Sequence, residues 1–452
     1  MKVLVVGGGG REHALCWGLA RSPRVEELHA APGNPGIGSV ATCHAAAADD
    51  VRAQVALADR VGADLVIVGP EAPLVAGLAD ELRDRGRAVL GPGRDGARLE
   101  GSKAFAKELM ERHGVPTARA ATFSRGAWER DRHDVLGFVD GLGRTAVVKA
   151  DGLAAGKGVT VASDRDETVR SIEAALAGGA FGAAGERIVV EERLDGPEVS
   201  AFALVDGSGV VPLGLAQDSK RVGDGDTGPN TGGMGAYSPL PWLDADDERR
   251  IWSIVEATVR GLRAEGIDYR GLLYTGLMLT ADGPKVLEYN CRFGDPETQV
   301  VVPRLGDDLV ELLAACAEGR LDDAKVSPSD LAAVTVVLAS GGYPGDHATG
   351  LEIHGLEAAA AVPDSIVFHA GTAERDDRVV TSGGRVLAAT GWGPSLSAAR
   401  ARAYEAASAT SFDGMIRRDD IAGSAAGGGR GDVAAAGAGS IGGSIGEDRR
   451  RT

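Results

Sequence analysis

The sequence predicts an α/β protein whose N-terminal part is a doubly wound parallel sheet. Apolar runs at 2–6, 27–31, 64–68 and 88–91 alternate with helical segments over the first hundred residues. Glycine-containing turns follow the first three of these runs. Strands that alternate with helices form parallel sheets, and such sheets bind ligands at the carboxyl ends of their strands. We therefore expect a ligand site near these turns.

The α/β pattern continues through the rest of the chain. A helix is expected from Ser102 to His113, and further strands are expected at 145–149, 158–162, 188–192, 199–205, 272–279 and 285–289. The segments group into an N-terminal domain at 1–101, a central domain at 102–325 with a small lid at about 120–190, and a C-terminal αβ domain at 326–421. Residues 422–452 contain mostly Gly, Ala and Ser, so we expect this tail to be disordered.

Composition and charge exclude several classes of protein. The chain has 452 residues, and its formal net charge of -17 disfavours binding to nucleic acid. Its four cysteines are scattered and form no Cys-x-x-Cys pair, so we expect reduced thiols in the cytoplasm. The short apolar run at the start passes directly into glycines, which indicates a buried strand rather than a signal peptide. No apolar stretch is long enough to span a membrane.

The first glycine run resembles a dinucleotide-binding fingerprint without completing it. Gly7 and Gly9 fit the pattern G-x-G-x-x-G, but Glu12 occupies the third glycine position. The second strand also ends without the acidic residue that would hold a ribose hydroxyl. The pattern therefore disfavours a nicotinamide-dependent dehydrogenase. Backbone N–H groups here can still bind a phosphate, and a tight turn without a ligand is the alternative.

A second glycine-rich segment resembles a Walker A loop. In Gly152–Gly158 the glycine spacing is one residue short, and Gly158 stands where Ser or Thr would bind Mg²⁺. This mismatch excludes a P-loop NTPase. The segment joins two expected strands, follows Lys149 and contains Lys157, so it is suited to a flap that covers ATP phosphates. The alternative is a plain hairpin turn.

Other residues supply the parts that phosphoryl transfer needs, namely cations, metal ligands and positioning groups. Lys103 and Lys149 can contact phosphates, and the turn that follows Glu191 can bind a nucleoside, with Glu198 placed for the ribose. Glu288 and Asn290 lie two apart on an expected strand, so they share a face on which Mg²⁺ can bind. Tyr289 should face the core. Each feature alone also fits a solvated turn or an edge strand.

As a set, these residues resemble the glycinamide ribonucleotide synthetases, a family of ATP-grasp ligases in purine biosynthesis. The resemblance covers residues 1 to about 421. It is carried by the strings VLVVGGGGREHAL, APGNPGIG, VGPEAPLVAGL, LEGSKAFAKELM, VVKADGLAAGKGV, EERLDGPEVSAFALVDG, DGDTGPNTGGMGAYSP, GPKVLEYNCRFGDPETQ, VVLASGGYPG, FHAGT and TSGGRVL.

The resemblance implies that glycine, 5-phosphoribosylamine and ATP are converted to glycinamide ribonucleotide, ADP and phosphate. The carboxylate of glycine would attack the γ-phosphate, and the amine of phosphoribosylamine would capture the resulting glycyl phosphate. The implied fold is an N-terminal Rossmann-like phosphoribosyl-binding domain, an ATP-grasp domain with a lid, and a C-terminal αβ domain. We expect a cytoplasmic monomer that uses Mg²⁺ or Mn²⁺ and has no membrane or nucleic-acid partner; neighbouring purine-pathway enzymes are candidate partners.

The resemblance also implies roles for individual residues. Catalytic roles fall to Lys149, Arg292 and Asp295. ATP would contact Lys103, Lys149, Gly156, Lys157, Gly158, Glu191, Leu194 and Glu198. The substrates would contact Gly9, Gly10, Asn34, Glu71, Asp218 and Arg292. The metal ligands would be Glu288 and Asn290.

One residue departs from the family pattern. Ser219 stands where the family usually has His, so it lacks a cation and has a shorter reach. The strand at 274–279 offers no acid, which leaves the ligands of a second metal open. The rivals are another ATP-grasp ligase, such as a biotin-dependent carboxylase or a formate-using transformylase, and a non-catalytic nucleotide sensor. The lysines, the flap and the pair Glu288/Asn290 argue against the sensor.

Overall fold

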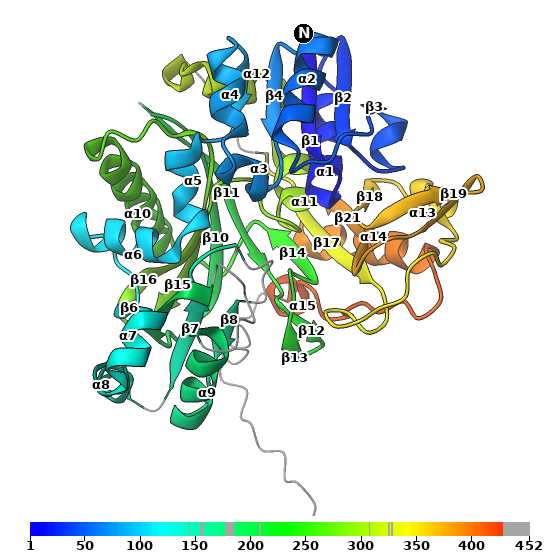
Figure 1. The fold of residues 1–452 in the computed structure, drawn as a ribbon. Coiled ribbons are helices and arrows are strands. Elements are labelled where there is room, and N and C mark those ends of the chain that lie inside the picture. Colours follow the sequence, from blue (N-terminus) through cyan, green and yellow to red (C-terminus); the bar gives the residue numbers. More distant parts are fainter. Residues whose placement is uncertain are drawn as a thin grey trace, which may run out of the picture.

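The structure is a computed structural model of the full chain (Figure 1). It describes residues 1–143, 145–153, 158–176, 185–207, 209–306, 308–323, 326 and 329–427. The expected ligand residues Gly156 and Lys157 lie outside these residues, as does the tail from 428 onward. Among the described residues, no helix combines the length and the apolar character that crossing a membrane requires.

The N-terminal sheet is parallel and has five strands in the order β3-β2-β1-β4-β5, as the sequence predicts for a doubly wound fold. Its strands are β1 (Lys2–Gly7), β2 (Glu27–Pro32), β3 (Thr42–Cys43), β4 (Leu65–Val68) and β5 (Ala88–Leu90). Its helices are α1 (Gly10–Leu19), the 3₁₀ helix η1 (Ile37–Ser39), α2 (Val51–Val61), α3 (Glu71–Val75) and α4 (Leu78–Asp84). Helices α5 (Arg94–Gly101) and α6 (Lys103–Arg112) lead to the central domain.

Local sequence signals fix the ends of these helices. The Asp50 side chain accepts a hydrogen bond from the Ala53 N–H at the start of α2, and Gly62 ends the helix in the left-handed conformation. Ser102 caps α6 in the same way through the Phe105 N–H. The caps place Lys103 on the first turn of α6, next to the site described below.

A four-stranded antiparallel sheet, here called the lid sheet, has the order β6-β9-β7-β8. Its strands are β6 (Ala120–Ser124), β7 (Ala146–Ala150), β8 (Val159–Val161) and β9 (Arg187–Glu192). Helices α7 (Arg125–Arg130), α8 (Arg132–Leu142) and α9 (Arg165–Leu176) accompany it. The expected glycine-rich connection does join two paired strands, β7 and β8.

The largest sheet, here called the central sheet, has eight strands in the order β16-β15-β10-β11-β14-β17-β21-β18, with antiparallel pairing throughout. The strands are β10 (Glu198–Asp206), β11 (Val210–Asp218), β14 (Gly235–Ser238), β15 (Arg270–Thr280), β16 (Gly283–Asn290), β17 (Ala332–Ala339), β18 (Ser365–His369) and β21 (Arg385–Gly393). Strand β14 pairs with β11 and with β17, so the sheet passes without a break from the central to the C-terminal domain.

Helices and two hairpins complete the fold. The helices are α10 (Ala245–Ala264), α11 (Thr298–Val301), α12 (Leu309–Glu318), α13 (Leu356–Ala360), α14 (Leu396–Ala409) and α15 (Gly423–Ala426), with the 3₁₀ helices η3 (Val302–Arg304) and η4 (Leu321–Asp323). The hairpins are β12 (Arg221–Gly223) with β13 (Thr227–Asn230), and β19 (Thr372–Arg375) with β20 (Arg378–Thr381). Figure 1 shows the N-terminal sheet in blue beside the central sheet.

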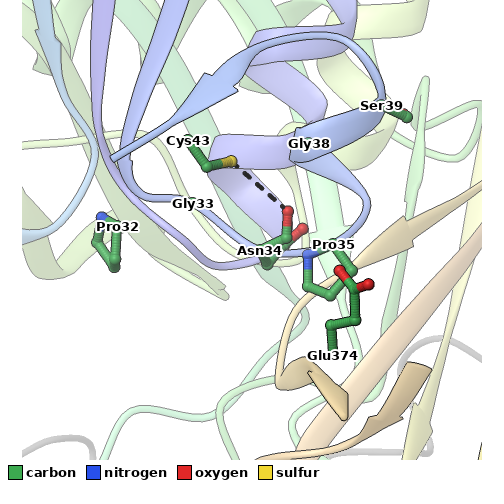
Figure 2. Close-up of a pocket in the computed structure, with 8 residues that line it drawn as sticks. All are labelled: Pro32, Gly33, Asn34, Pro35, Gly38, Ser39, Cys43 and Glu374. Carbon is green, nitrogen blue, oxygen red and sulfur yellow. Dashed lines mark hydrogen bonds between the residues drawn. The ribbon is translucent and has the colours of Figure 1, made fainter. Parts of the chain in front are cut away.

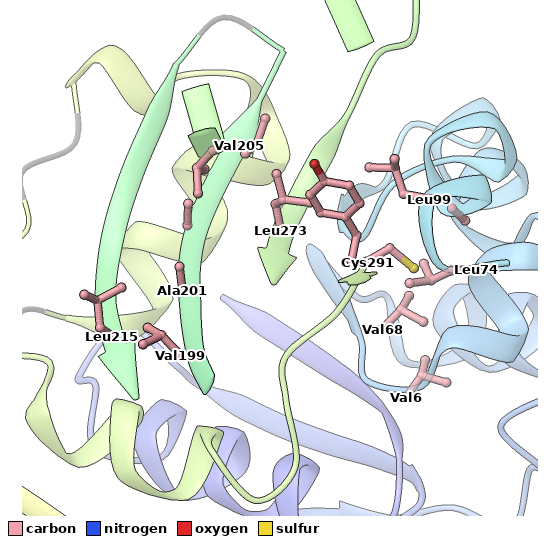
Figure 3. Close-up of a cluster of buried hydrophobic side chains, with 14 of the residues drawn as sticks. Val6, Val68, Leu74, Leu99, Val199, Ala201, Val205, Leu215, Leu273 and Cys291 are labelled. Carbon is pink, nitrogen blue, oxygen red and sulfur yellow. The ribbon is translucent and has the colours of Figure 1, made fainter. Parts of the chain in front are cut away.

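One buried apolar cluster connects the N-terminal domain with the central sheet (Figure 3). Val6 and Val68 of the N-terminal sheet belong to the same cluster as Leu99 of α5, Val199 of β10 and Leu273 of β15. Burial of such side chains is the main stabilising contribution to folding. This shared core fixes the N-terminal glycine turn relative to the strands that carry the expected metal ligands.

The structure confirms the fold class and corrects the start of the tail. Residues 422–427 were expected to be disordered, but α15 lies there, and Ala422 and Ala425 are buried in the same cluster. That prediction is wrong for these residues because their small apolar side chains pack against the core. The domain boundaries at 101, 325 and 421 stay predictions.

The interface between the N-terminal and C-terminal domains predicts the effect of one glycine substitution. A Cβ at Gly36 would lie 2.6 Å from His369 Cγ and would also meet the His13 ring. We expect Gly36→Ala to lower the free energy of unfolding by about 1–3 kcal/mol, because overpacking forces these rings to move. Thermal or denaturant unfolding measures this loss.

Gly38 provides the matched control on the same loop. A Cβ at Gly38 would meet only Cys43 Sγ, at 3.9 Å, and Gly38 is exposed. Gly38→Ala should therefore leave the unfolding midpoint almost unchanged. Equal effects of the two substitutions would contradict the close packing inferred at Gly36.

Candidate active site

A buried carboxylate holds two lysines where the lid sheet meets the central sheet. Glu191 Oε1 lies 2.5 Å from Lys149 Nζ, and Glu191 Oε2 lies 2.6 Å from Lys107 Nζ. Burial would raise the pKa of the Glu191 carboxyl, but the two ammonium groups hold this pKa below its usual value. Burial also lowers the pKa of the Lys107 amine. The three groups form a desolvated ion cluster with a net positive charge.

Lys149 also links the lid sheet to the strand that carries the expected metal ligands. Its amine donates a hydrogen bond to the Leu287 carbonyl of β16 at 3.0 Å. Leu287 precedes Glu288, so the Lys149 amine lies beside the expected metal site. This arrangement brings a cation and the expected metal-binding carboxylate to one place, as phosphoryl transfer requires.

Lys103 contacts the first part of the flap. Its amine donates to the Gly152 carbonyl at 3.1 Å, and burial lowers the pKa of this amine. The neighbouring Asp151 accepts hydrogen bonds from the Ser102 hydroxyl at 2.9 Å and from the Ala104 N–H at 3.1 Å. The start of α6 thus anchors the base of the flap. At its other end, the Gly158 carbonyl accepts from the Ala150 N–H at 2.8 Å.

The expected nucleoside-binding residues lie on the segment from β9 to β10. Leu194 is partly exposed in this connection, and Glu198 begins β10. Gly196 is needed here because it has a φ of +149° and because a Cβ would collide with the Leu279 carbonyl of β15. Both carboxylate oxygens of Glu191 are engaged by lysines. Its place in a nucleoside pocket stays a prediction.

Strand β16 presents Glu288 and Asn290 on one face. The intervening Tyr289 is buried and its hydroxyl lies 2.7 Å from the Thr258 hydroxyl, which confirms the expected alternation. In the described part of the chain, no group of three or more His, Cys, Asp or Glu side chains could hold a metal ion by itself. The carboxylate and amide oxygens suit Mg²⁺, which takes its other ligands from phosphates and water.

A second ion cluster lies next to this face and includes the expected substrate residue Asp218. Lys220 Nζ lies 2.9 Å from Asp218 Oδ2 and 3.9 Å from Glu198 Oε2. Glu297 is buried, and its carboxylate accepts a hydrogen bond from the Ser200 hydroxyl at 3.2 Å. Burial, together with the negative charge of Asp218, raises the pKa of Glu297 to about 7.

Arg292 is held between two acids from the N-terminal side of the molecule. Its Nε donates to Glu71 Oε2 at 3.2 Å, and its Nη2 lies 2.9 Å from Glu100 Oε1. Burial would lower the pKa of the guanidinium, but the two carboxylates raise it. The structure therefore brings the expected residues Arg292 and Glu71 together, with Glu100 as a partner that the sequence did not reveal.

Asp295 lies at the N-terminal glycine turn, over the first residues of α1. Its Oδ2 accepts from the Arg11 N–H at 3.2 Å, and its Oδ1 accepts from Gln299 Nε2 at 3.1 Å. A Cβ at Gly9 or Gly10 would lie 3.6 or 3.7 Å from Asp295 Oδ2. Asp295 thus meets Gly9 and Gly10, which are distant from it in the sequence, at the start of α1.

Asn34 is engaged by the protein itself. Its amide donates to the Gly8 and His369 carbonyls, both at 2.9 Å, and its Oδ1 accepts from the Ile37 N–H at 2.9 Å. Both amide donors are used, so Asn34 ties the glycine turn to the C-terminal domain. Its contact with a substrate stays a prediction.

A hollow of about 510 Å³ lies between the segment that contains Asn34 and Glu374 of β19 (Figure 2). Its lining residues are Pro32, Gly33, Asn34, Pro35, Gly38, Ser39, Cys43 and Glu374. None of the expected ATP or metal ligands lines it. The nucleotide site therefore stays a prediction at the lysine cluster and β16.

Several charged residues near the site were not identified from the sequence, namely Glu100, Lys107, Lys220, Glu297 and Arg385, of which Arg385 lies 3.4 Å from Asp295 Oδ1. Lys107 lies one helical turn after Lys103, so their spacing could have shown that the two share a face of α6. Glu297 ends the run 292–297, which places three charged residues in a segment that also contains Gly and Pro, and this charge density is a sequence signal. For Arg385 and Glu100 the sequence gives no such signal.

Comparison with known proteins follows the same domain order. Family models described as the N domain, the ATP-grasp (A) domain and the C domain of phosphoribosylglycinamide synthetase match residues 1–100, 101–298 and 333–424. A phosphoribosylamine–glycine ligase of Streptomyces coelicolor is 53% identical over 431 residues, which cover 94% of this chain and all of the relative. The phosphoribosylamine–glycine ligase of Pseudomonas aeruginosa is 50% identical over 425 residues, which cover 93% of this chain and 97% of the relative.

Solved structures show the same relationship. The crystal structure of a phosphoribosylamine–glycine ligase from Thermotoga maritima has a TM-score of 0.80 and 35% identity, and covers 93% of this chain and all of its own. The biotin carboxylase domain of a Hydrogenobacter thermophilus 2-oxoglutarate carboxylase has a TM-score of 0.71 and 20% identity. The match covers 92% of this chain and 91% of that domain, and at this identity it shows a shared fold alone. With matches across all three domains, this chain belongs to the phosphoribosylglycinamide synthetase family.

Proposed function

We propose that this chain is an ATP-dependent ligase that joins glycine to 5-phosphoribosylamine and forms glycinamide ribonucleotide, ADP and phosphate in purine biosynthesis. One observation carries the phosphoryl-transfer part of the proposal. The Lys149 amine is shared between the buried carboxylate of Glu191 and the Leu287 carbonyl, which precedes the metal-binding pair Glu288 and Asn290. The family match carries the identity of the substrates.

The reaction divides into two transfers. A carboxylate oxygen of glycine attacks the γ-phosphorus of ATP, ADP leaves, and glycyl phosphate forms. The amine of phosphoribosylamine then attacks the glycyl carbonyl, loses a proton, and expels phosphate. The first transfer places negative charge on the phosphoryl oxygens, so fixed cations at this point lower its barrier.

The expected site residues divide this work among three regions. Lys103 and Lys149 stabilise the phosphates, and Gly158 lies on the flap that is expected to cover them; Gly156 and Lys157, which lie outside the described residues, have the same expected role. Glu191, Leu194 and Glu198 line the nucleoside pocket, with the Glu191 side chain orienting Lys149. Glu288 and Asn290 bind Mg²⁺ or Mn²⁺, which when bound neutralises charge on the phosphates.

The substrates occupy the region between the glycine turn and the Asp218 cluster. Gly9, Gly10 and Glu71 accommodate the phosphoribosyl group, since a helix N-terminus attracts phosphate. Arg292, Asp295 and Asp218 orient the reacting groups. We further propose that the enzyme works as a monomer in the cytoplasm, in keeping with the biosynthetic role of its relatives and the four cysteines, all unpaired.

The function is tested by measuring ADP formation with glycine and freshly prepared phosphoribosylamine, and by omitting each component in turn. We expect ADP only when ATP, the divalent metal, glycine and phosphoribosylamine are all present, with glycinamide ribonucleotide formed in equal amount. Turnover supported by bicarbonate or formate in place of glycine would replace this proposal with a different ATP-grasp ligase.

The metal-binding role of Glu288 predicts the effect of removing its charge. Glu288→Gln keeps the size of the side chain but removes a negative ligand, so we expect kcat to fall on the order of 10²–10³-fold. The requirement for metal should rise as well. Titration of activity with Mg²⁺ measures both changes.

Glu256→Gln is the matched control, because Glu256 is an exposed residue of α10 whose carboxylate pairs only with Arg260 among the contacts described. This variant should keep wild-type activity. Near-normal turnover of Glu288→Gln at the Mg²⁺ concentration that saturates the wild type would show that Glu288 is not a metal ligand.

Close packing around the expected glycine site predicts substrate choice. A Cβ at Gly233 would lie 2.5 Å from Pro296 Cδ and 3.4 Å from Asp218 Oδ2, so the loop approaches Asp218 tightly. A methyl group added at the α-carbon of glycine would collide with such a tightly packed loop. In apolar pockets, one methylene more or less already changes kcat/KM by about 10–200-fold. We expect kcat/KM for alanine to be at least about tenfold below that for glycine. Equal use of both amino acids would show that the pocket is wider.

A further inference from the structure

A residue of the C-terminal domain reaches into the region assigned to the substrates. Arg385 begins β21, and its side chain is mostly buried. Its Nη1 donates to the Gly232 carbonyl at 2.6 Å and to the Asp295 carbonyl at 2.7 Å, and lies 3.4 Å from Asp295 Oδ1. One guanidinium therefore contacts two segments that are more than sixty residues apart in the sequence.

The loop at 231–235 is shaped to receive this guanidinium. A Cβ at Gly232 would lie 3.1 Å from Arg385 Cζ, so the backbone and the guanidinium are in direct contact. On the next residue, a Cβ at Gly233 would meet Pro296. A side chain at position 232 would displace Arg385, and one at position 233 would displace Pro296 of the turn that bears Asp295. A second C-terminal residue, Tyr343, accepts a hydrogen bond from the Gly232 N–H at 3.0 Å.

Both segments lead to groups assigned to the reaction. Gly233 lies beside Asp218, while Asp295 contacts the glycine turn through the Arg11 N–H. Planar guanidinium groups fix such geometry better than an ammonium because their donors have set directions. We infer that Arg385 is a positioning residue of the ligase: it holds the 231–235 loop and Asp295 in one fixed relation across the domain boundary. This inference rests on the proposed function.

The inference predicts a loss of efficiency without a loss of nucleotide binding. In Arg385→Met the loop and Asp295 lose their common partner, and small displacements of reacting groups cost up to about 10²-fold in rate. We expect kcat/KM for glycine and phosphoribosylamine to fall by about this factor, while the KM for ATP stays near the wild-type value. Arg378→Met is the control, since Arg378 lies in the same domain, is exposed and pairs with Glu352.

The titration of the Asp295 carboxyl separates positioning from general damage to the fold. Burial would raise the pKa of Asp295, but Arg385 and Arg11 lower it, with the neutral Gln299 as a further partner. Loss of the Arg385 charge should raise the pKa of the Asp295 carboxyl in Arg385→Met, which NMR titration of this carboxyl measures. Arg385→Lys keeps the charge but has a shorter reach than the Nη1 that donates to both segments, so the pKa of Asp295 should stay low while the rate remains low.

Hydrogen exchange gives a readout that does not depend on turnover. The amides of 231–235 should exchange faster in Arg385→Met than in Arg378→Met, because the loop has lost one of its hydrogen-bond partners. If Arg385→Met does not fold, Tyr343→Phe removes the acceptor of the Gly232 N–H and should raise exchange in the same loop and lower kcat/KM. If the wild type is active and a folded Arg385 variant shows unchanged amide exchange and unchanged kinetics, the inference on Arg385 is overturned and the proposed function stands. A wild type that makes no ADP from glycine and phosphoribosylamine would overturn the proposed function.

Discussion

The turn from Arg292 to Glu297 is the point on which the arrangement of the site depends, because its three charged side chains have partners in three different parts of the molecule. Arg292 binds Glu71 and Glu100 on the N-terminal side. Asp295 binds the start of α1 and Arg385, and Glu297 turns into the central sheet toward Ser200. Buried charges are costly unless each is paired, so these contacts must form together. Pairing of this kind fixes the position of each domain relative to the turn.

The continuous central sheet also fixes the arrangement of the site. Because β14 pairs with both β11 and β17, the C-terminal strands have a set register relative to the strand that ends at Asp218. Register in a half-buried sheet is strongly specified, since a shift by one residue would expose the core face. Arg385 at the start of β21 therefore reaches the 231–235 loop from a rigid strand. Through Arg385 the C-terminal domain contacts two segments that carry expected site residues.

Much of the fold and part of the site could be predicted from the sequence because those features are local. Continuous apolar runs predicted β1, β4 and β7, and the two-residue spacing of Glu288 and Asn290 predicted their shared face. The pairings between distant segments could not be predicted this way. Nothing in the local sequence indicates that Lys107 and Lys149 both pair with Glu191. Nor does it indicate that the Asn34 amide donates hydrogen bonds to the Gly8 and His369 carbonyls. The single sheet was missed because the pairing of β14 with β17 joins segments nearly a hundred residues apart.

The charge of the chain also has a consequence for how anionic substrates reach the site. A net charge of -17 repels ATP and phosphoribosylamine at long range, although salt screens this repulsion beyond about 10 Å. Close to the expected phosphate site, Lys107 and Lys149 share the carboxylate of Glu191, and Lys103 is bound to a backbone carbonyl. In a desolvated environment, nearby cations act on a phosphate more strongly than a distant, solvated negative surface does. We therefore expect these buried lysines to attract phosphates despite the overall acidity of the protein.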